Sequence, residues 1–299
     1  MTAAARVVAA VGVITFVTPA TTSVAAQEHA HHSVSRATAS PDATTAFLVS
    51  TREGTARYQS LDSAIIDGYR KVGGDIPSMG EHWIHPARVM SGILDARRPS
   101  VLIYTRVAGR PKLAGVAYTA VLRPGDPYPD SPAGADAWHE HNGSVDEGTL
   151  PLAHAAHVPS QEPTRVAVMH AWIWVANPRG VWVADNWAMP FVRARLRPDS
   201  AAWAAAHALA LAADGGTAYY ERAIALTVGT DEPLRTRAHI ALAESAAAAT
   251  AIRDAASGRL TVSDLARLDS IWNGLWAGLA ARSTAVQAER LNRLTDPHR

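Results

Sequence analysis

The stretch that most constrains the fold of this chain runs from Arg165 to Phe191 and reads RVAVMHAWIWVANPRGVWVADNWAMPF. Residues 166–175 are apolar on both sides of an extended chain, which predicts a β-strand buried on both faces. Residues 177–180, Asn-Pro-Arg-Gly, fit a type I turn, and residues 181–183 then predict an antiparallel return strand. His170 lies inside the resulting hairpin. A histidine there is either a hydrogen-bonded core residue or a ligand held on a rigid element.

The first 26 residues have the pattern of a signal peptide. Arg6 supplies a positive start, residues 7–17 are apolar, and residues 23–26 offer a small-residue cleavage site. No later segment reaches the run of roughly 18 apolar residues expected of a transmembrane helix. We therefore expect an exported protein, secreted or periplasmic, without a membrane span.

The composition excludes two classes of site. The formal net charge is +1 and the arginines are scattered, so the sequence shows no electrostatic footprint for nucleic acid. The chain has no cysteine, so it forms no disulfides and offers no thiolate to a metal. Histidine, carboxylate and backbone oxygen remain as ligands, and these suit divalent zinc, copper or iron.

The rest of the chain divides into three parts by composition. Residues 27–41 are polar and predict a disordered linker, whose histidines form either a tolerated polar terminus or a weak copper- or zinc-binding arm. Residues 42–197 predict a mixed core domain, and residues 198–299 an alanine-rich helical region. The expected fold class is α+β: a mostly antiparallel sheet with an N-terminal helix before it and helices after it.

Within these parts the sequence predicts individual elements. Helical spacing covers residues 42–70, with a break expected at Gly54, and ends at Gly73-Gly74. Residues 79–86 predict a loop or short strand, and residues 100–106 and 112–122 a second hairpin. The helices expected near the C-terminus span residues 199–213, 217–227, 230–257 and 263–294.

Histidine is the most informative residue type in the chain. Seven of the thirteen histidines fall between His82 and His170. His139 and His141 are two residues apart, so their rings point the same way if the chain is extended there. Together His82, His139, His141 and His170 supply three or four imidazoles, near the number that a zinc, copper or iron centre requires.

Two glutamates beside these histidines are the candidate catalytic residues. In a strand, Glu81 and Glu140 point away from the neighbouring histidines. They are therefore candidates for hydrogen-bond partners of the ligands, or for a general base that acts from another direction. His154 and His157 are weaker candidates, because their segment has a flexible composition. The motifs of serine hydrolases, phosphate-binding loops and dinucleotide folds are absent from the sequence.

A set of short motifs is spread over residues 55–191. The set consists of Ala56-Arg57-Tyr58, Asp67-Gly68-Tyr69, Met79-Gly80-Glu81-His82, the strands Pro99 to Tyr104 and Leu113 to Tyr118, His170-Ala171-Trp172, and Asn177-Pro178-Arg179-Gly180. On these motifs the chain resembles a family of uncharacterised exported bacterial proteins with no known activity. Many relatives carry a glutamate where this chain has Ala117, so a carboxylate role there does not transfer. The resemblance implies an exported fold in which His82 and His170 are the positions of interest.

Three functional hypotheses follow. The first is a metal-dependent enzyme, a hydrolase or oxygenase, in which a water occupies an open coordination position and Glu81 or Glu140 moves a proton. The second is a non-catalytic protein of the cell envelope that binds a metal or a small molecule, with tryptophans lining an apolar pocket. The third is a structural domain whose histidines are buried and satisfied. His207 and His239 are expected to be structural or surface residues.

Overall fold

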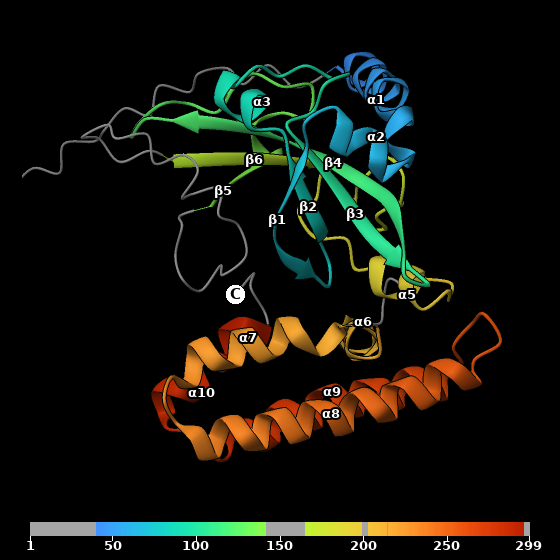
Figure 1. The fold of residues 1–299 in the computed structure, drawn as a ribbon, viewed down its shortest axis with the longest axis vertical. Coiled ribbons are helices and arrows are strands. Elements are labelled where there is room, and N and C mark those ends of the chain that lie inside the picture. Colours follow the sequence, from blue (N-terminus) through green and yellow to red (C-terminus); the bar gives the residue numbers. More distant parts are fainter. Residues whose placement is uncertain (1–39, 142–164, 199–202, 214, 296–299) are drawn as a thin grey trace, which may run out of the picture. The chain divides into compact units, whose positions relative to one another are not determined.

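The computed structural model describes residues 40–141, 165–198, 203–213 and 215–295. In this part of the chain the strands are β1 (Arg70–Ile76), β2 (Gly80–Ile84), β3 (Val101–Val107), β4 (Arg110–Leu122), β5 (Trp138–His141) and β6 (Arg165–Ala171). They form one antiparallel sheet in the order β1-β2-β3-β4-β6-β5 (Figure 1). With helices before and after the sheet, the α+β class is confirmed. The predicted signal peptide lies outside the described residues, as does the linker up to residue 39.

The segment before the sheet, where helical spacing with a break at Gly54 is predicted for residues 42–70, forms several short elements, and the first of them ends at Thr55, one residue after Gly54. They are α1 (Pro41–Thr55), η1 (Ala56–Gln59) and α2 (Leu61–Ile66); α3 (Pro86–Ser91) follows β2, and η2 (Ala135–Ala137) precedes β5. Ser60 has an extended backbone, with φ −89° and ψ 120°, and this separates η1 from α2. Gly73 and Gly74, predicted to end the helix, lie inside β1.

One side of the sheet, here called the tyrosine face, packs against these N-terminal elements. It presents Tyr104 and Tyr118, which are buried in one apolar cluster with Tyr58 and Tyr69. The Tyr104 hydroxyl donates to the Tyr58 carbonyl at 2.6 Å. Arg88 of α3 donates to the Tyr69 hydroxyl at 2.6 Å. The buried hydroxyls therefore have partners, and they fix the N-terminal segment on the sheet.

The hairpin predicted from residues 100–106 and 112–122 is confirmed as β3 and β4. Its turn is tighter than expected, because Val107 pairs with Arg110 and only Ala108 and Gly109 lie between them. Their φ angles are 50° and 74°, as in the type I′ turn whose twist suits a two-residue hairpin. Pro111 therefore belongs to the strand.

The hairpin predicted at residues 165–191 is only partly correct. The turn is confirmed, because the Gly180 N–H donates to the Asn177 carbonyl at 3.0 Å. The strand β6 ends at Ala171, however, and residues 181–183 form no strand. Both edges of β6 are already paired, one with β4 and the other with β5. The chain after the turn therefore has no free edge beside β6 and runs on to α5 (Met189–Arg193).

The C-terminal part described by the structure is helical, as predicted. Its elements are α6 (Trp203–Leu211), α7 (Gly216–Val228), α8 (Glu232–Ala255), α9 (Val262–Ala280) and α10 (Ala285–Thr295). The single helix predicted for residues 263–294 is divided into α9 and α10. Thr284 and Gln287 explain the division, because each side chain hydrogen-bonds the other residue's backbone N–H, at 3.2 and 2.9 Å. This reciprocal capping starts a new helix.

A stripe of large apolar side chains on α9 forms the core of the helical part. Leu268, Trp272, Leu275, Trp276 and Leu279 are all buried, as the helical spacing predicts. Among the described residues, no helix combines the length and the apolar character needed to cross a membrane. Residues 37–299 form one compact unit.

Candidate functional site

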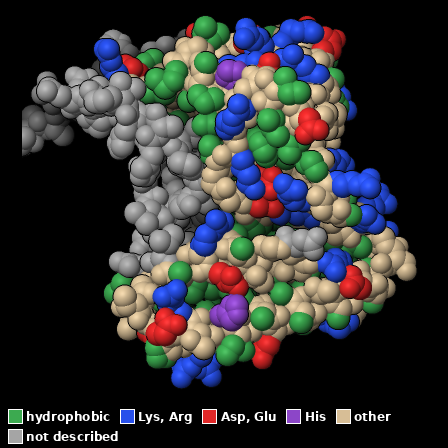
Figure 2. Space-filling model, viewed as in Figure 1, with side chains coloured by type: hydrophobic (Ala, Val, Ile, Leu, Met, Phe, Trp, Pro, Cys, Tyr) green, Lys and Arg blue, Asp and Glu red, His purple; other side chains and the backbone are tan. Residues whose placement is uncertain are grey.

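Three of the four histidines predicted as metal ligands have side chains that lie next to one another. The ring centroids of His82 and His170 are 6.0 Å apart, and those of His139 and His170 are 5.0 Å apart. His82 and His170 are 2% and 0% exposed, and His139 is half-buried. On the face seen in Figure 2, histidine side chains are visible singly and not as a group. We call His82, His139 and His170 the histidine cluster.

Strand register explains why the three side chains share one face. His82 on β2 is opposite Ile103, His170 on β6 is opposite Ala117, and His139 on β5 is opposite Val168. Directly opposed residues in a sheet point to the same side, and alternation along β3 and β6 places all three pairs on one side. The cluster therefore lies on the face opposite the tyrosine face, and we call it the histidine face.

The middle of the histidine face has room for large rings because β4 has only small residues there. The strands β2 and β6 are separated by β3 and β4, so a flat sheet would hold them about 14 Å apart. The ring separation of 6.0 Å between His82 and His170 is much shorter. Between them β4 presents Gly115, which has no side chain, and Ala117, which has only a methyl group, so no large side chain of β4 keeps the two imidazoles apart.

The segment after β6 encloses one side of the cluster. The ring of Trp172 lies 5.9 Å from that of His170, and its indole N–H donates to the Val183 carbonyl at 2.6 Å. A side chain at Gly115 would meet Trp172 at 2.9 Å, so glycine is required for this packing. The turn that the sequence predicts thus holds an indole against the candidate site.

Buried polar residues that the sequence reasoning missed fix this segment in place. Asp185 and Asn186 are 1% and 0% exposed. Asp185 accepts a hydrogen bond from the Ser78 hydroxyl at 3.0 Å, and Asn186 donates to the Val175 carbonyl at 3.0 Å. The only available signal was a pair of polar residues within an apolar stretch.

The remaining candidate histidines are described only in part. The backbone of His141 belongs to β5 and is opposite Val166, but its side chain lies outside the described residues. His154 and His157 lie outside them entirely. Their predicted roles stay predictions.

Glu81 lies on the tyrosine face, opposite Tyr104, and points away from the cluster. Its carboxylate is 2.9 Å from the Lys71 ammonium and 2.8 Å from the Arg106 guanidinium. Burial alone would raise the pKa of Glu81, but the hydrogen bonds from Arg106 and Lys71 outweigh it and lower the pKa below its usual value. Glu81 is therefore a paired anion, and none of its hydrogen bonds or ion pairs reaches a histidine.

Glu140 also faces away from the cluster, because alternation in β5 places it on the side opposite His139. It accepts hydrogen bonds from the Tyr128 hydroxyl at 3.0 Å and from Arg165 at 2.5 Å. These contacts tie β5 to the neighbouring loop and strand. The proton-transfer roles predicted for Glu81 and Glu140 thus have no support from their positions.

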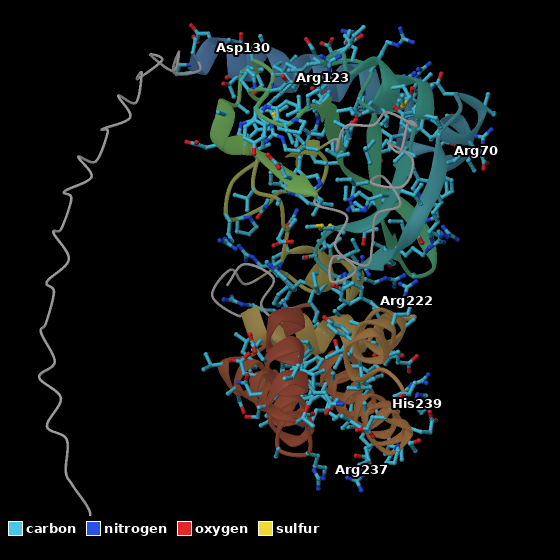
Figure 3. The ribbon with its side chains drawn as sticks, turned by 90° about the vertical axis from the view of Figure 1, so that its left-hand side faces the viewer. Arg70, Arg123, Asp130, Arg222, Arg237 and His239 are labelled. Carbon is cyan, nitrogen blue, oxygen red and sulfur yellow. The ribbon has the colours of Figure 1, made fainter. Side chains whose placement is uncertain are left out.

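Two further described histidines, on the helices of the C-terminal part, have different surroundings. His239 is exposed on α8 (Figure 3), and its Nδ1 lies 3.1 Å from the Glu221 carboxylate. His207 is 3% exposed and hydrogen-bonds the Tyr220 hydroxyl at 2.9 Å. Its ring stacks on Trp272 with centroids 4.2 Å apart, and burial lowers its pKa to about 3. His207 therefore stays neutral and acts as a core residue.

The spacing of the histidine cluster suits a shared metal ion. A zinc–nitrogen distance of about 2.0 Å and a tetrahedral angle place the centroids of two bound imidazoles about 5 Å apart. The two observed separations are 5.0 and 6.0 Å. Among the described residues, however, no group of three or more acidic or histidine side chains is already arranged around one point. Binding therefore requires rotation of at least one ring.

Comparison of the chain with protein-family models, with curated proteins and with solved structures finds no match in any of the three. The family resemblance drawn from the short motifs therefore stays a prediction.

Proposed function

We propose that this chain is an exported protein that binds one divalent transition metal ion through His82, His139 and His170. The observation that supports this proposal is the 5.0 and 6.0 Å spacing of three imidazoles on one face of a sheet. Imidazole nitrogen suits zinc and copper, and strands hold ligands more rigidly than loops do. The export rests on the signal-peptide pattern of the first 26 residues.

The geometry favours metal binding over a metal-dependent hydrolase or oxygenase. A hydrolytic metal site needs a group that takes a proton from the bound water. The two predicted groups, Glu81 and Glu140, are held in ion pairs on the tyrosine face. His82 and His170 are almost fully buried, so a substrate would have little access to an ion bound between them. We therefore propose the non-catalytic role as the function.

Metal content of the protein purified without an affinity tag tests this proposal. Tail histidines are removed first, by the substitutions His29→Ser, His31→Ser and His32→Ser, so that they do not bind metal themselves. His139→Ala is the most informative single variant, because His139 is only half-buried and its loss leaves the core intact. His239→Ala is the matched control, since it removes an exposed imidazole far along the sequence.

The expected result is about one zinc or copper ion per chain in the tail-substituted protein and in the His239→Ala control. His139→Ala and His170→Ala should lose most of that metal. Cobalt substituted for zinc should show the intense visible bands of a four-coordinate site in the parent and lose them in His139→Ala. If His82→Ala, His139→Ala and His170→Ala all retain the metal of the parent, or if the parent binds none, the proposal is wrong and the cluster is a packed core.

A further inference from the structure

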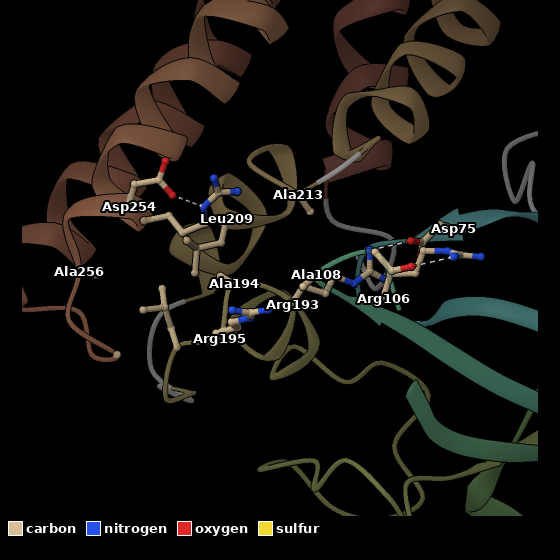
Figure 4. A pocket seen from close by; sticks show the side chains of 14 residues that line it. Asp75, Arg106, Ala108, Arg193, Ala194, Arg195, Leu209, Ala213, Asp254 and Ala256 are labelled. Atoms are coloured by element: carbon tan, nitrogen blue, oxygen red, sulfur yellow. Dashed lines mark hydrogen bonds and ion pairs between the residues drawn. The ribbon is translucent and has the colours of Figure 1, made fainter. Parts of the chain in front are cut away.

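A second candidate site lies at the other end of the sheet strands, in a cavity lined by four arginines. The cavity has a volume of about 540 Å³ (Figure 4). This is within the range of small-molecule sites in proteins. Its charged lining consists of Asp75, Arg106, Arg193, Arg195, Arg253 and Asp254. Four positive charges face two negative ones, so the cavity favours an anion.

Three of these arginines are already neutralised by acidic partners. Arg193 pairs with Asp75, Arg253 with Asp254, and Arg106 with Glu81, at N–O distances of 2.5, 2.8 and 2.8 Å. Arg195 differs from them. Among the described residues, no hydrogen bond or ion pair involves its guanidinium, and Figure 4 shows no dashed line to it. The positive charge left over in the cavity is therefore that of Arg195.

The backbone of Arg195 gives an independent reason to assign it a role. The Leu196 N–H donates to the Phe191 carbonyl at 2.8 Å, and the Arg195 N–H donates to the Val192 carbonyl at 3.1 Å. These two bonds make a Schellman motif at the end of α5, with Arg195 at its left-handed position, φ 58°. Glycine usually occupies this position, because a side chain there is strained.

Strained residues of this kind concentrate at functional sites. Here the strain accompanies an unpaired guanidinium that lines a cavity, whereas glycine would form the same motif without strain. The arginine is not needed for the turn. Its planar array of N–H donors is suited to the two oxygens of a carboxylate or a phosphate.

We propose that this cavity binds a small organic anion, carboxylate or phosphate, and that Arg195 is its principal contact. The paired arginines hold the rim in place: Arg193 is fixed by its two bonds to Asp75 and by a further bond to the Thr105 hydroxyl at 2.8 Å. Arg195 is thus presented on a rigid frame. The site shares no lining residue with the histidine cluster, so it is independent of metal binding.

Calorimetric titration of the full chain with inorganic phosphate and, separately, with citrate tests the proposal, with sodium chloride of matched ionic strength as the reference. Arg195→Gly is the decisive variant, because glycine suits the left-handed position and the variant remains folded. Arg197→Ala is the matched control: it removes the same charge two residues away, at an exposed residue that does not line the cavity.

We expect binding of at least one of the two anions to the parent and to Arg197→Ala, weakened about tenfold or more in Arg195→Gly. Binding of citrate alone identifies a carboxylate site, and binding of phosphate alone a phosphate site. The proposal is overturned if neither anion binds at millimolar concentration, or if Arg195→Gly binds as tightly as the parent.

Discussion

At the scale of single residues, Arg195 has a backbone conformation that is unfavourable for any residue with a side chain. Its φ of 58° costs a non-glycine residue about 1–2 kcal/mol. We expect Arg195→Gly to raise the free energy of unfolding by about 1 kcal/mol, measured by chemical denaturation in buffer without phosphate or citrate. Arg195→Ala keeps the strain and should bring no such gain. Equal stabilities of the two variants would contradict a strained position.

His207 provides a second prediction at this scale. Burial lowers its pKa to about 3 in the folded protein, whereas the unfolded chain takes up the proton near pH 6.5. Between these values the unfolded state binds more protons, so stability falls as the pH falls from about 6.5 towards 3. At about 1.4 kcal/mol per pKa unit the loss reaches a few kcal/mol. Denaturation curves measured across this pH range give the free energy of unfolding at each pH. In His207→Phe this free energy should depend less steeply on pH than in the parent. An unchanged slope in that variant would exclude His207 as the cause.

At the scale of elements, the sequence predicts turns and helix ends, which depend on neighbouring residues, and misses strand pairing, which depends on distant parts of the chain. The turn at residues 177–180 was predictable, since its residue types suit each position. The absence of a return strand was not, because it depends on β4 and β5 occupying both edges of β6. The division of α9 from α10 was visible in principle, because Thr284 and Gln287 form a recognisable capping pair.

Two helical glycines give opposite predictions for the same substitution. A side chain at Gly54 in α1 would lie 2.5 Å from the Arg97 Cα, so Gly54→Ala must displace the helix and should destabilise the protein. Gly274 in α9 has nothing within 4 Å of the same position. Gly274→Ala should therefore stabilise the protein by up to about 1 kcal/mol, the difference in helix propensity. Thermal unfolding of both variants checks the signs. A stabilising Gly54→Ala would mean that α1 does not pack closely there.

At the scale of the whole molecule, the histidine cluster is the feature that sequence spacing alone could not establish. His82 and His170 are separated by most of the sheet domain in sequence, and by β3 and β4 in space. Their meeting depends on the register of four strands and on the small residues of β4. The sequence pointed to four histidines, and the side chains of three of them meet. It could not show that Glu81 forms ion pairs with Lys71 and Arg106, or that Glu140 forms one with Arg165.

Metal binding at this cluster should appear as a pH-dependent gain in the stability of the whole fold. An ion that binds only the folded chain stabilises it by about 2.7 kcal/mol at 100 times its dissociation constant. The ligands must be neutral imidazoles, so the gain should be largest at neutral and higher pH and be lost in acid, where protons compete with the ion for the ring nitrogens. Thermal unfolding of the tail-substituted protein with and without zinc, at several pH values, measures this difference.

Because each comparison is made at one pH, the acid sensitivity of His207 cancels. His139→Ala should show no zinc-dependent gain at any pH, and a gain equal to that of the parent would place the bound ion elsewhere.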